Sequence, residues 1–416
     1  MKISINSNLM KLAKLFKKNG AKLYLVGGCV RNAMIGIPSF DTDICSSLSP
    51  DAVAAFLDGT DFSYIFKNKE LGTMDIIYDG NVWEYTTLRK ENYPDSGAHK
   101  PQSVEFIKSI EVDSQRRDFS VNSIYVDIVK GEIIDPNDGI RDIKKKQLRA
   151  VVDPNLVFLH DGLRILRMIR FSSELNFRIE PKTFIGAHTH RANLADISGE
   201  RKRNELLELL SCSKKYPTHT KKKAYIHGLN KYNKLGLWKY FNLPIEKVRY
   251  SLVKHAGVEQ RFMALVVDIV SSVSPHDKFA FLTNFLGTDG LCFASDEVED
   301  MTNEICGYFE ALEKVNNKDY FFKYFNNFAQ IYPLIKLKSP NLAKKYNFFY
   351  KYLINNKIAI QIKDLDIKGI DIKKKYPNIP QRRYSYILNE LLSKVFDGVI
   401  KNSKQDLLEE VRNYDY

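Results

Sequence analysis

The hydrophobic pattern of this 416-residue chain changes near residue 150. Before that point, short β-branched and aromatic runs alternate with turn residues, as strands of a sheet do; the runs are residues 23–26, 72–78, 82–88 and 121–129. After it, apolar residues recur every three or four positions, which is typical of helices; the segments are residues 204–210, 260–271, 302–314, 384–395 and 405–412. The pattern predicts an α+β fold, with a mixed sheet and helices at the N-terminus followed by an all-helical remainder.

A glycine pair, Gly27 and Gly28, follows the first predicted strand and precedes a helical segment that starts at Cys29. Glycines at a strand-to-helix turn let backbone N–H groups approach a phosphate, and the positive end of the helix dipole favours the same anion. Arg31 would add a cationic contact. Because a glycine pair is also common in ordinary turns, it indicates an anion site only together with its neighbours.

Two aspartates, Asp41 and Asp43, are separated by one residue shortly after this turn. In an extended segment, residues i and i+2 point to the same face, so the two carboxylates lie side by side. At about 4 Å, two like charges repel by roughly 4 kcal/mol at an effective dielectric constant near 20. A divalent cation relieves this repulsion, and the pair therefore predicts a Mg²⁺ site. An isolated Asp-x-Asp is also common in solvated loops.

A third carboxylate, Glu84, lies in an alternating aromatic and β-branched stretch that predicts a strand over residues 81–89. Three acidic groups on neighbouring strands are what two-metal phosphoryl or nucleotidyl transfer requires. A glutamate on a strand is more often simply exposed to solvent, so Glu84 is the least specific member of the predicted catalytic trio with Asp41 and Asp43.

Five segments in order resemble the motifs of the class II tRNA nucleotidyltransferase and poly(A) polymerase family. They are GGCVRN with DTD (residues 27–32 and 41–43), RRDFSVNS (116–123), the hinge-like DPNDGIRD (135–142), HDGLR (160–164) and GERKRNE (199–205). The resemblance implies a nucleotidyltransferase head followed by a helical neck, body and tail. It also implies two groups of site residues: catalytic carboxylates at Asp41, Asp43 and Glu84, and nucleotide-binding residues at Gly27, Gly28, Arg31, Arg116, Arg117, Asp118, Asn122, Asp161, Arg164, Arg167 and Arg170.

The chemistry of these residue types agrees with the implied roles. Arg116 and Arg117 offer two guanidinium groups suited to triphosphate oxygens, although a basic surface corner has the same composition. Asp161 and Arg164 are three residues apart in a run that predicts one amphipathic helix, so they are expected on one helix face. Such a pair can accept from an exocyclic amine and donate to a ring acceptor, a combination that cytosine and adenine both present. An ordinary surface ion pair has the same spacing.

Two residues depart from the family pattern. Asn32 stands where the family usually has an aspartate, and it lacks the negative charge that would orient Arg31. His160 replaces a glutamate beside Asp161, and we expect it to affect the support of the base-binding pair rather than the chemistry.

Residues 86–106 resemble the loop of CCA-adding enzymes, which in the family helps the pocket change from C to A. The resemblance therefore implies template-independent addition of CCA to tRNA 3′ ends from CTP and ATP, with pyrophosphate release. Alternatives that remain are a partial enzyme that adds only A or only CC, a poly(A) polymerase, and a catalytically silent tRNA-binding protein. The sequence gives no indication of oligomeric state.

The formal net charge of +13 is consistent with a polyanionic partner, although lysine richness is also typical of a biased genome. Five scattered cysteines without metal-ligand spacing suit a reducing compartment, and no apolar run reaches membrane-spanning length. These features predict a cytoplasmic protein that does not enter a membrane. His276 and Asp277 form an adjacent His-Asp pair, but it lies in a turn-like segment, so we expect the body to be structural.

We expect four domains: a catalytic head (1–150), a nucleotide-selecting neck (151–220), a body (221–330) and a tail that binds the tRNA elbow (331–416). In the tail, a basic cluster lies among prolines and tyrosines and is a candidate for phosphate contacts, although it is equally typical of a solvated face. Its members are Lys373, Lys374, Lys375, Arg382 and Arg383.

Overall fold

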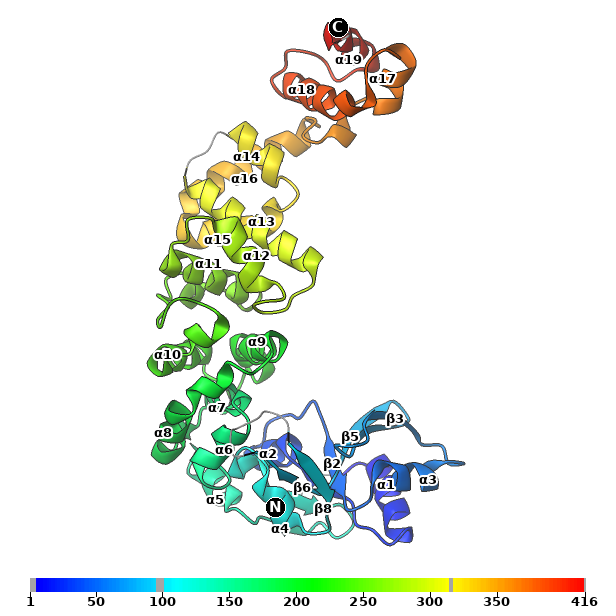
Figure 1. The fold of residues 1–416 in the computed structure, drawn as a ribbon, viewed down its shortest axis with the longest axis vertical. Helices are drawn as coiled ribbons and strands as arrows, with labels where there is room; N and C mark the ends of the chain where they lie inside the picture. The colour runs from blue at the N-terminus through cyan, green and yellow to red at the C-terminus, as the bar shows by residue number, and fades with distance from the viewer. Residues whose placement is uncertain (1–4, 95–100, 314–316, 415–416) are drawn as a thin grey trace. The chain divides into compact units, whose positions relative to one another are not determined.

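The computed structural model describes residues 5–94, 101–313 and 317–414 (Figure 1). Contacts divide the chain into two compact units, one made of Met1–Val248 with Thr288–Cys292 and the other of Arg249–Gly287 with Phe293–Tyr416. Among the described residues, the strands all lie in the first unit, and the second unit consists of helices and the segments that connect them. The α+β fold expected from the sequence is confirmed.

The main sheet of the first unit has seven strands in the order β3-β4-β5-β2-β1-β8-β9. β2 and β5 are parallel, and the other neighbouring pairs are antiparallel. The strands are β1 (Tyr24–Val26), β2 (Asp43–Ser46), β3 (Ser63–Asn68), β4 (Thr73–Tyr78), β5 (Asn81–Thr87), β8 (Tyr125–Asp127) and β9 (Ile133–Ile134). The strand expected over residues 121–129 is shorter than predicted, because Ser120–Asn122 forms a 3₁₀ turn instead.

Helices α1 (Ser7–Lys18) and α3 (Pro50–Leu57) contribute to the core on one face of this sheet. Phe16 of α1 contacts the rings of Phe56 and Tyr85 at centroid distances of 5.0 and 5.8 Å. Since side chains alternate along a strand, the burial of Trp83 and Tyr85 in this core directs Glu84 to the opposite face of β5. That opposite face carries the candidate site.

Helix α2 (Gly28–Ile35) follows β1 directly, and α4 (Ile110–Gln115) and α5 (Gly139–Lys144) complete the head. Two short strand pairs lie outside the main sheet: β6 (Arg89–Asn92) with β7 (Ser103–Phe106), and β10 (Gln147–Leu148) with β11 (Arg178–Ile179). The β6–β7 pair forms the base of the loop predicted over residues 86–106, of which residues 95–100 lie outside the described part of the chain.

Five helices complete the first unit: α6 (Pro154–His160), α7 (Leu163–Glu174), α8 (Pro181–Thr189), α9 (Gly199–Lys215) and α10 (Ala224–Leu235). α7 packs against both α9 and α10, and nearly all of its side chains are buried. Its arginines, from Arg164 to Arg170, are therefore held by a tightly packed helix rather than by a surface one.

The second unit contains α11 (Arg261–Val273), α12 (Lys278–Leu286), α13 (Ser295–Leu312), α14 (Asn317–Tyr324), α15 (Phe328–Lys338), α16 (Pro340–Asn355), α17 (Gly369–Lys375), α18 (Tyr384–Phe396) and α19 (Lys404–Val411). Asp277 caps α12, since its carboxylate accepts from the Ala280 N–H at 3.1 Å. Over the described residues, none of the helices combines the length and apolar character needed to span a bilayer.

Candidate active site

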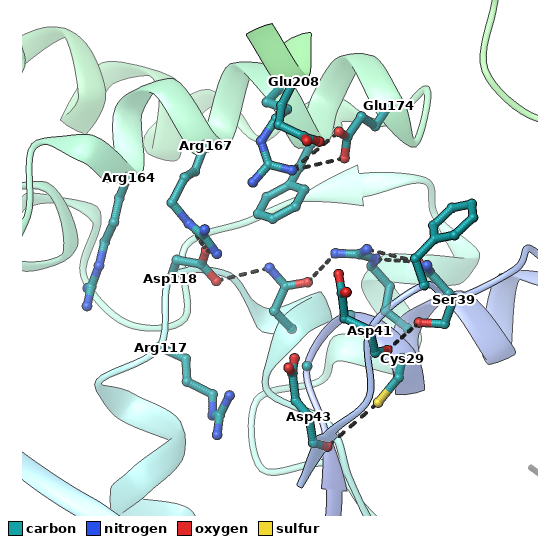
Figure 2. A pocket seen from close by; sticks show the side chains of 18 of the residues that line it. Cys29, Ser39, Asp41, Asp43, Arg117, Asp118, Arg164, Arg167, Glu174 and Glu208 are labelled. Atoms are coloured by element: carbon teal, nitrogen blue, oxygen red, sulfur yellow. Dashed lines mark hydrogen bonds and ion pairs between the residues drawn. The ribbon is translucent and has the colours of Figure 1, made fainter. Parts of the chain in front are cut away.

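The site residues predicted in the first unit all line one pocket of about 570 Å³. It is lined by Gly27, Gly28, Arg31, Asp41, Asp43, Glu84, Arg116, Arg117, Asp118, Asn122, Asp161, Arg164, Arg167 and Arg170 among others. Figure 2 shows Asp41 near Ser39 on one side of this pocket and Arg164 and Arg167 on the other, with Asp43 below, between Cys29 and Arg117. The chain thus brings together residues more than 100 positions apart.

The turn at Gly27 determines where the carboxylate of Asp43 lies. Gly27 has φ of +78°, a conformation that favours glycine, and a Cβ atom added there would lie 2.6 Å from Asp43 Oδ2. The Asp43 carboxylate therefore occupies space that only a glycine leaves open. Gly28 begins α2, whose N-terminal end opens into the same pocket.

Asp43 and Glu84 are register partners in the parallel pair of β2 and β5, so their side chains leave the sheet on the same face. Burial, followed by the nearby charge of Glu84, raises the pKa of Asp43 to about 6, while Arg117 opposes the shift. The Glu84 carboxylate is 58% exposed and lies 3.8 Å from the ammonium of Lys67.

The donor set suits a small divalent cation held by two carboxylates. Over the described residues, no group of three or more His, Cys, Asp and Glu side chains is arranged to hold a metal by itself. Mg²⁺ commonly uses one or two carboxylates plus substrate phosphates rather than a complete protein cage. The raised pKa of Asp43 reflects buried negative charge that a cation would stabilise, so Asp41 and Asp43 fit the ion.

Arg116 and Arg117 are fixed by Asp113, a fully buried carboxylate that the sequence analysis did not single out. Asp113 accepts from Arg116 Nε at 2.8 Å and from Arg117 Nη2 at 3.1 Å, and it also accepts from the hydroxyl of Tyr125 at 2.6 Å. Burial would raise the pKa of Asp113, but the charges of Arg117 and Arg116 lower it well below its usual range. The i,i+3 and i,i+4 spacing from Asp113 was the available sequence signal.

A chain of polar contacts crosses the pocket from α7 to α2. Asp118 Oδ2 accepts from Arg167 Nη2 at 2.8 Å, and Asp118 Oδ1 accepts from Asn122 Nδ2 at 3.0 Å. Arg31 Nη1 in turn donates to Asn122 Oδ1 at 2.6 Å. Burial would raise the pKa of Asp118, but the charge of Arg167 and the Asn122 hydrogen bond lower it to about 2. Asp118 is therefore a fixed anion that orients its neighbours.

Asn32 holds Arg31 in spite of lacking a charge. Its Oδ1 accepts from Arg31 Nε at 3.1 Å and from Nη2 at 2.8 Å. Its Nδ2 donates to the carbonyl of Pro38 and to the hydroxyl of Tyr216, both at 3.0 Å. All four hydrogen-bonding positions of this buried amide are thus used.

The expectation that Asp161 and Arg164 share one helix is wrong. Asp161 is extended, with φ of −150° and ψ of 107°, and it ends α6, whereas Arg164 lies in the first turn of α7. The break lies at Asp161 itself, since Gly162 already has a helical backbone with φ of −58° and ψ of −27°. Gly162 packs closely against the backbone of Asn193, from which a Cβ atom would lie 2.6 Å away. Asp161 binds Arg201 at 3.2 Å, and Arg164 Nη2 donates to the Arg116 carbonyl at 2.6 Å. Both residues nevertheless line the pocket.

The remaining motif residues support α7. Arg170 Nε donates to Glu205 of α9 at 2.6 Å, and Arg170 also pairs with Glu174 at 3.3 Å. His160 stacks on Tyr93 with ring centroids 4.4 Å apart and an interplanar angle of 6°. His160 therefore ties the segment after β6 to the end of α6, next to Asp161.

Several further pocket residues had no site role predicted from the sequence, although Cys29, Leu163 and Arg201 lie within the motifs named above. They are Cys29, Ser39, Phe40, Leu163, Phe171, Glu174, Arg201, Glu208, Lys215 and Tyr216. Burial raises the pKa of the Cys29 thiol to about 11, so this cysteine is protonated at neutral pH.

The basic cluster predicted in the tail lies in the second unit. Lys373, Lys374 and Lys375 are exposed in the last turn of α17. Arg382 and Arg383 lie in the 3₁₀ turn before α18, and Arg382 is exposed.

Comparison with known proteins places these elements in a family. Residues 23–149 match the Poly A polymerase head domain, and residues 176–221 match the probable RNA and SrmB-binding site of polymerase A. The CCA-adding enzyme of Bacillus licheniformis is 34% identical over 284 residues, which cover 66% of each chain. That of Levilactobacillus brevis is 37% identical over 222 residues, 53% of this chain and 52% of the relative. The chain thus spans between about half and two thirds of these curated relatives.

Solved structures share the fold over nearly the whole chain. The Bacillus stearothermophilus CCA-adding enzyme in complex with CTP superposes with a TM-score of 0.73 and 22% identity, covering 98% of this chain and 96% of that one. The Thermotoga maritima CCA-adding enzyme complexed with tRNA-CCA gives a TM-score of 0.62 and 19% identity, covering 99% and 96%. With its head domain, motif order and fold in agreement, the chain belongs to the family of class II tRNA nucleotidyltransferases and poly(A) polymerases.

Proposed function

We propose that this protein adds CCA to the 3′ ends of tRNA, using CTP and ATP and releasing pyrophosphate. The observation that carries the proposal is the charge arrangement of the pocket. The nearly buried guanidinium groups of Arg31 and Arg164 have neutral oxygens as their hydrogen-bond partners among the described residues, and they share a pocket with Asp41 and Asp43. Buried cations without carboxylate partners are costly, and a triphosphate supplies the missing negative charge.

The arginines are oriented before the nucleotide arrives. Asp113 fixes Arg116 and Arg117 through hydrogen bonds of 2.8 to 3.1 Å. Because these side chains are already ordered, little conformational entropy is lost when they bind phosphate oxygens. The glycine turn at Gly27 and Gly28 adds backbone N–H groups at the start of α2.

In the reaction, the terminal ribose hydroxyl of the tRNA attacks the α-phosphate of CTP or ATP. A phosphodiester bond forms, the bond to the β-phosphate breaks, and pyrophosphate leaves. Asp41 and Asp43 would hold Mg²⁺ at this point, and Glu84 is the neighbouring carboxylate that completes the predicted two-metal trio. When bound, the ions stabilise the negative charge that develops on the phosphoryl oxygens.

Selection of the base rests on Asp161 and Arg164, which face the pocket from successive helices. Arg201 orients Asp161 at 3.2 Å, and the Arg116 carbonyl orients Arg164 at 2.6 Å. The carboxylate accepts from the exocyclic amine of cytosine or adenine, and the guanidinium donates to the ring acceptor. Uracil and guanine invert part of this pattern, so they bind less well.

The division of labour along the chain is also part of the proposal. Residues 1–150 act as the catalytic head, 151–220 as the selecting neck, 221–330 as a structural body, and 331–416 as the tail that binds the tRNA elbow. The exposed lysines of α17 suit contacts with phosphates that are independent of sequence. Five free cysteines suit the reducing cytoplasm, where we propose that the protein acts.

The experiment that tests the function uses three tRNA acceptors. One lacks the whole CCA sequence, one ends after its first C, and one ends after its second C. We expect incorporation of C into the first two and of A into the third, with no incorporation of U or G. Addition of A alone or of C alone would identify a partial enzyme. Extension of arbitrary RNA with A only would identify a poly(A) polymerase, and no incorporation by any route would contradict the proposal.

A further inference from the structure

Phe40 presents a large aromatic surface to solvent at the edge of the pocket. Its side chain lies directly before Asp41 in the chain, lines the pocket, and is 64% exposed. An exposed phenyl ring lacks the stabilisation that burial of its apolar surface would give. A ring held in this way beside a catalytic carboxylate is suited to contact a bound substrate. None of the polar chemistry proposed above uses it.

The segment that carries Phe40 is held by Asn32. The Nδ2 group of Asn32 donates to the Pro38 carbonyl at 3.0 Å, and the hydroxyl of Ser39 donates to the Asp41 carbonyl at 2.9 Å. These bonds fix the backbone on both sides of Phe40, so the exposed ring stays beside Asp41.

Tyr216 provides the wall behind this ring. Its aromatic ring is 4% exposed and lies 6.0 Å from that of Phe40 with an interplanar angle of 38°. The second hydrogen of Asn32 Nδ2 is donated to its hydroxyl at 3.0 Å. An aspartate at position 32 would have no N–H to donate to either Pro38 or Tyr216. The amide of Asn32 therefore holds Tyr216 and the backbone at Pro38, two residues before Phe40, against α2.

The position of Phe40 in the pocket indicates which substrate its ring can contact. Arg164, which is proposed to bind the incoming base, and Arg167 lie across the pocket from Ser39, with Asp41 between them and close to Ser39 (Figure 2). The incoming base lies on the side of Arg164, and the acceptor must bring its terminal hydroxyl to the carboxylates of Asp41 and Asp43. The side of Phe40, next to Asp41, is therefore the side left for the terminal nucleotide of the acceptor.

We propose that Phe40, supported by Tyr216, stacks on the base of the 3′-terminal nucleotide of the RNA acceptor. This inference rests on the proposed function and deepens it. The acceptor ends in a different nucleotide before each addition, so a contact that recognises hydrogen-bonding groups would impede some steps. Stacking on an aromatic ring accepts every base, because each presents a π face.

The test compares the full-length protein with its Phe40→Ala and Phe40→Tyr variants. We expect Phe40→Ala to raise the KM for tRNA about tenfold, while Phe40→Tyr restores it, since stacking on one aromatic ring is worth this order of magnitude. The KM for CTP should change less than about twofold, because the base of CTP binds on the Arg164 side of the pocket, away from Phe40. Phe279→Ala, which removes another exposed phenyl ring from α12, is the matched control and should leave both constants unchanged.

A second measurement needs no turnover. A tRNA with 2-aminopurine as its 3′-terminal base should lose fluorescence on binding the wild-type protein, and Phe40→Ala should abolish that quenching. An unchanged KM for tRNA, a raised KM for CTP in its place, or quenching that survives Phe40→Ala would overturn the inference while leaving the proposed function intact. If the wild-type protein incorporates no nucleotide, the proposed function fails, and the quenching measurement still decides whether Phe40 stacks on the acceptor base.

Discussion

Asp43 Oδ2 lies 2.6 Å from the position that a Cβ atom of residue 27 would occupy. The position of the Asp43 carboxylate therefore depends on the glycine turn, because a side chain at position 27 would occupy the same space. Gly27 also has φ of +78°, so both its conformation and its surroundings require glycine.

A Gly27→Ala variant should lose activity by at least about a hundredfold, since displacement of a catalytic group by as little as 1 Å can have this effect. Gly20 is the matched control: it has a φ of +76°, but a Cβ there would meet nothing within 4 Å. Gly20→Ala should therefore show the cost of the backbone strain alone, with normal kinetics. Equal activity in the two variants, measured as kcat for CTP incorporation, would contradict this account of the turn.

The effect of Mg²⁺ on the stability of the wild type and of an Asp43→Asn variant should show whether Asp43 binds the ion. Burial and the charge of Glu84 raise the pKa of Asp43, so its ionised form opposes folding at neutral pH. Without divalent ions, Asp43→Asn should stabilise the fold by on the order of 1–2 kcal/mol. Added Mg²⁺ should raise the melting temperature of the wild type but not of this variant, whereas the exposed control Asp61→Asn should respond as the wild type does. A Mg²⁺ response that survives in Asp43→Asn would place the ion elsewhere.

The stability that Asp118 contributes to the fold should depend on pH. Its pKa in the folded protein is about 2, below the ordinary value of 3.8, so it stabilises the fold fully above the unfolded pKa. That contribution is lost as the pH falls through the folded value. Asp118→Asn should therefore be less stable than the wild type by on the order of 2 kcal/mol at pH 7, and the difference should shrink between pH 5 and pH 2. Urea unfolding across this range measures it, and a constant difference would argue against the Arg167 pairing.

Arg164 should be sensitive to the shape of its cationic group as well as to its charge. Arg164→Lys keeps the charge but cannot both bond the Arg116 carbonyl and present a planar donor to the base. We expect kcat/KM for CTP and ATP to fall about 10- to 100-fold, with weaker discrimination against UTP and GTP, since a good bidentate base contact is worth about 1–3 kcal/mol. Kinetics with all four nucleotides check this result. An unchanged preference for C and A would assign base selection to other residues.

The parts of the site that could be predicted from sequence are those with local signals. The Gly27 turn and the Asp41–Asp43 pair each lie within a few residues, and strand alternation directs Glu84 to the correct face of β5. Local spacing failed at Asp161, because this residue has an extended backbone between α6 and α7, and its carboxylate pairs with Arg201, 40 positions away in the chain.

Tertiary contacts explain what the sequence left open. Tyr216 and Asn32 are 184 positions apart in the chain, so no local pattern predicts their hydrogen bond. Phe40 is notable only because it is exposed beside the pocket, a property that hydrophobic patterns do not encode. Asp113 could have been found from its spacing to Arg116 and Arg117, but its complete burial could not.

The most direct test of the central claim measures incorporation of labelled CTP into tRNA lacking its CCA end, by the wild-type protein and by Asp43→Ala, with pyrophosphate release followed in parallel. The account predicts that the wild type adds C with one pyrophosphate released per nucleotide, and that the variant loses both signals while keeping its affinity for tRNA. Undiminished incorporation by Asp43→Ala would contradict the claim that this carboxylate holds the catalytic ion.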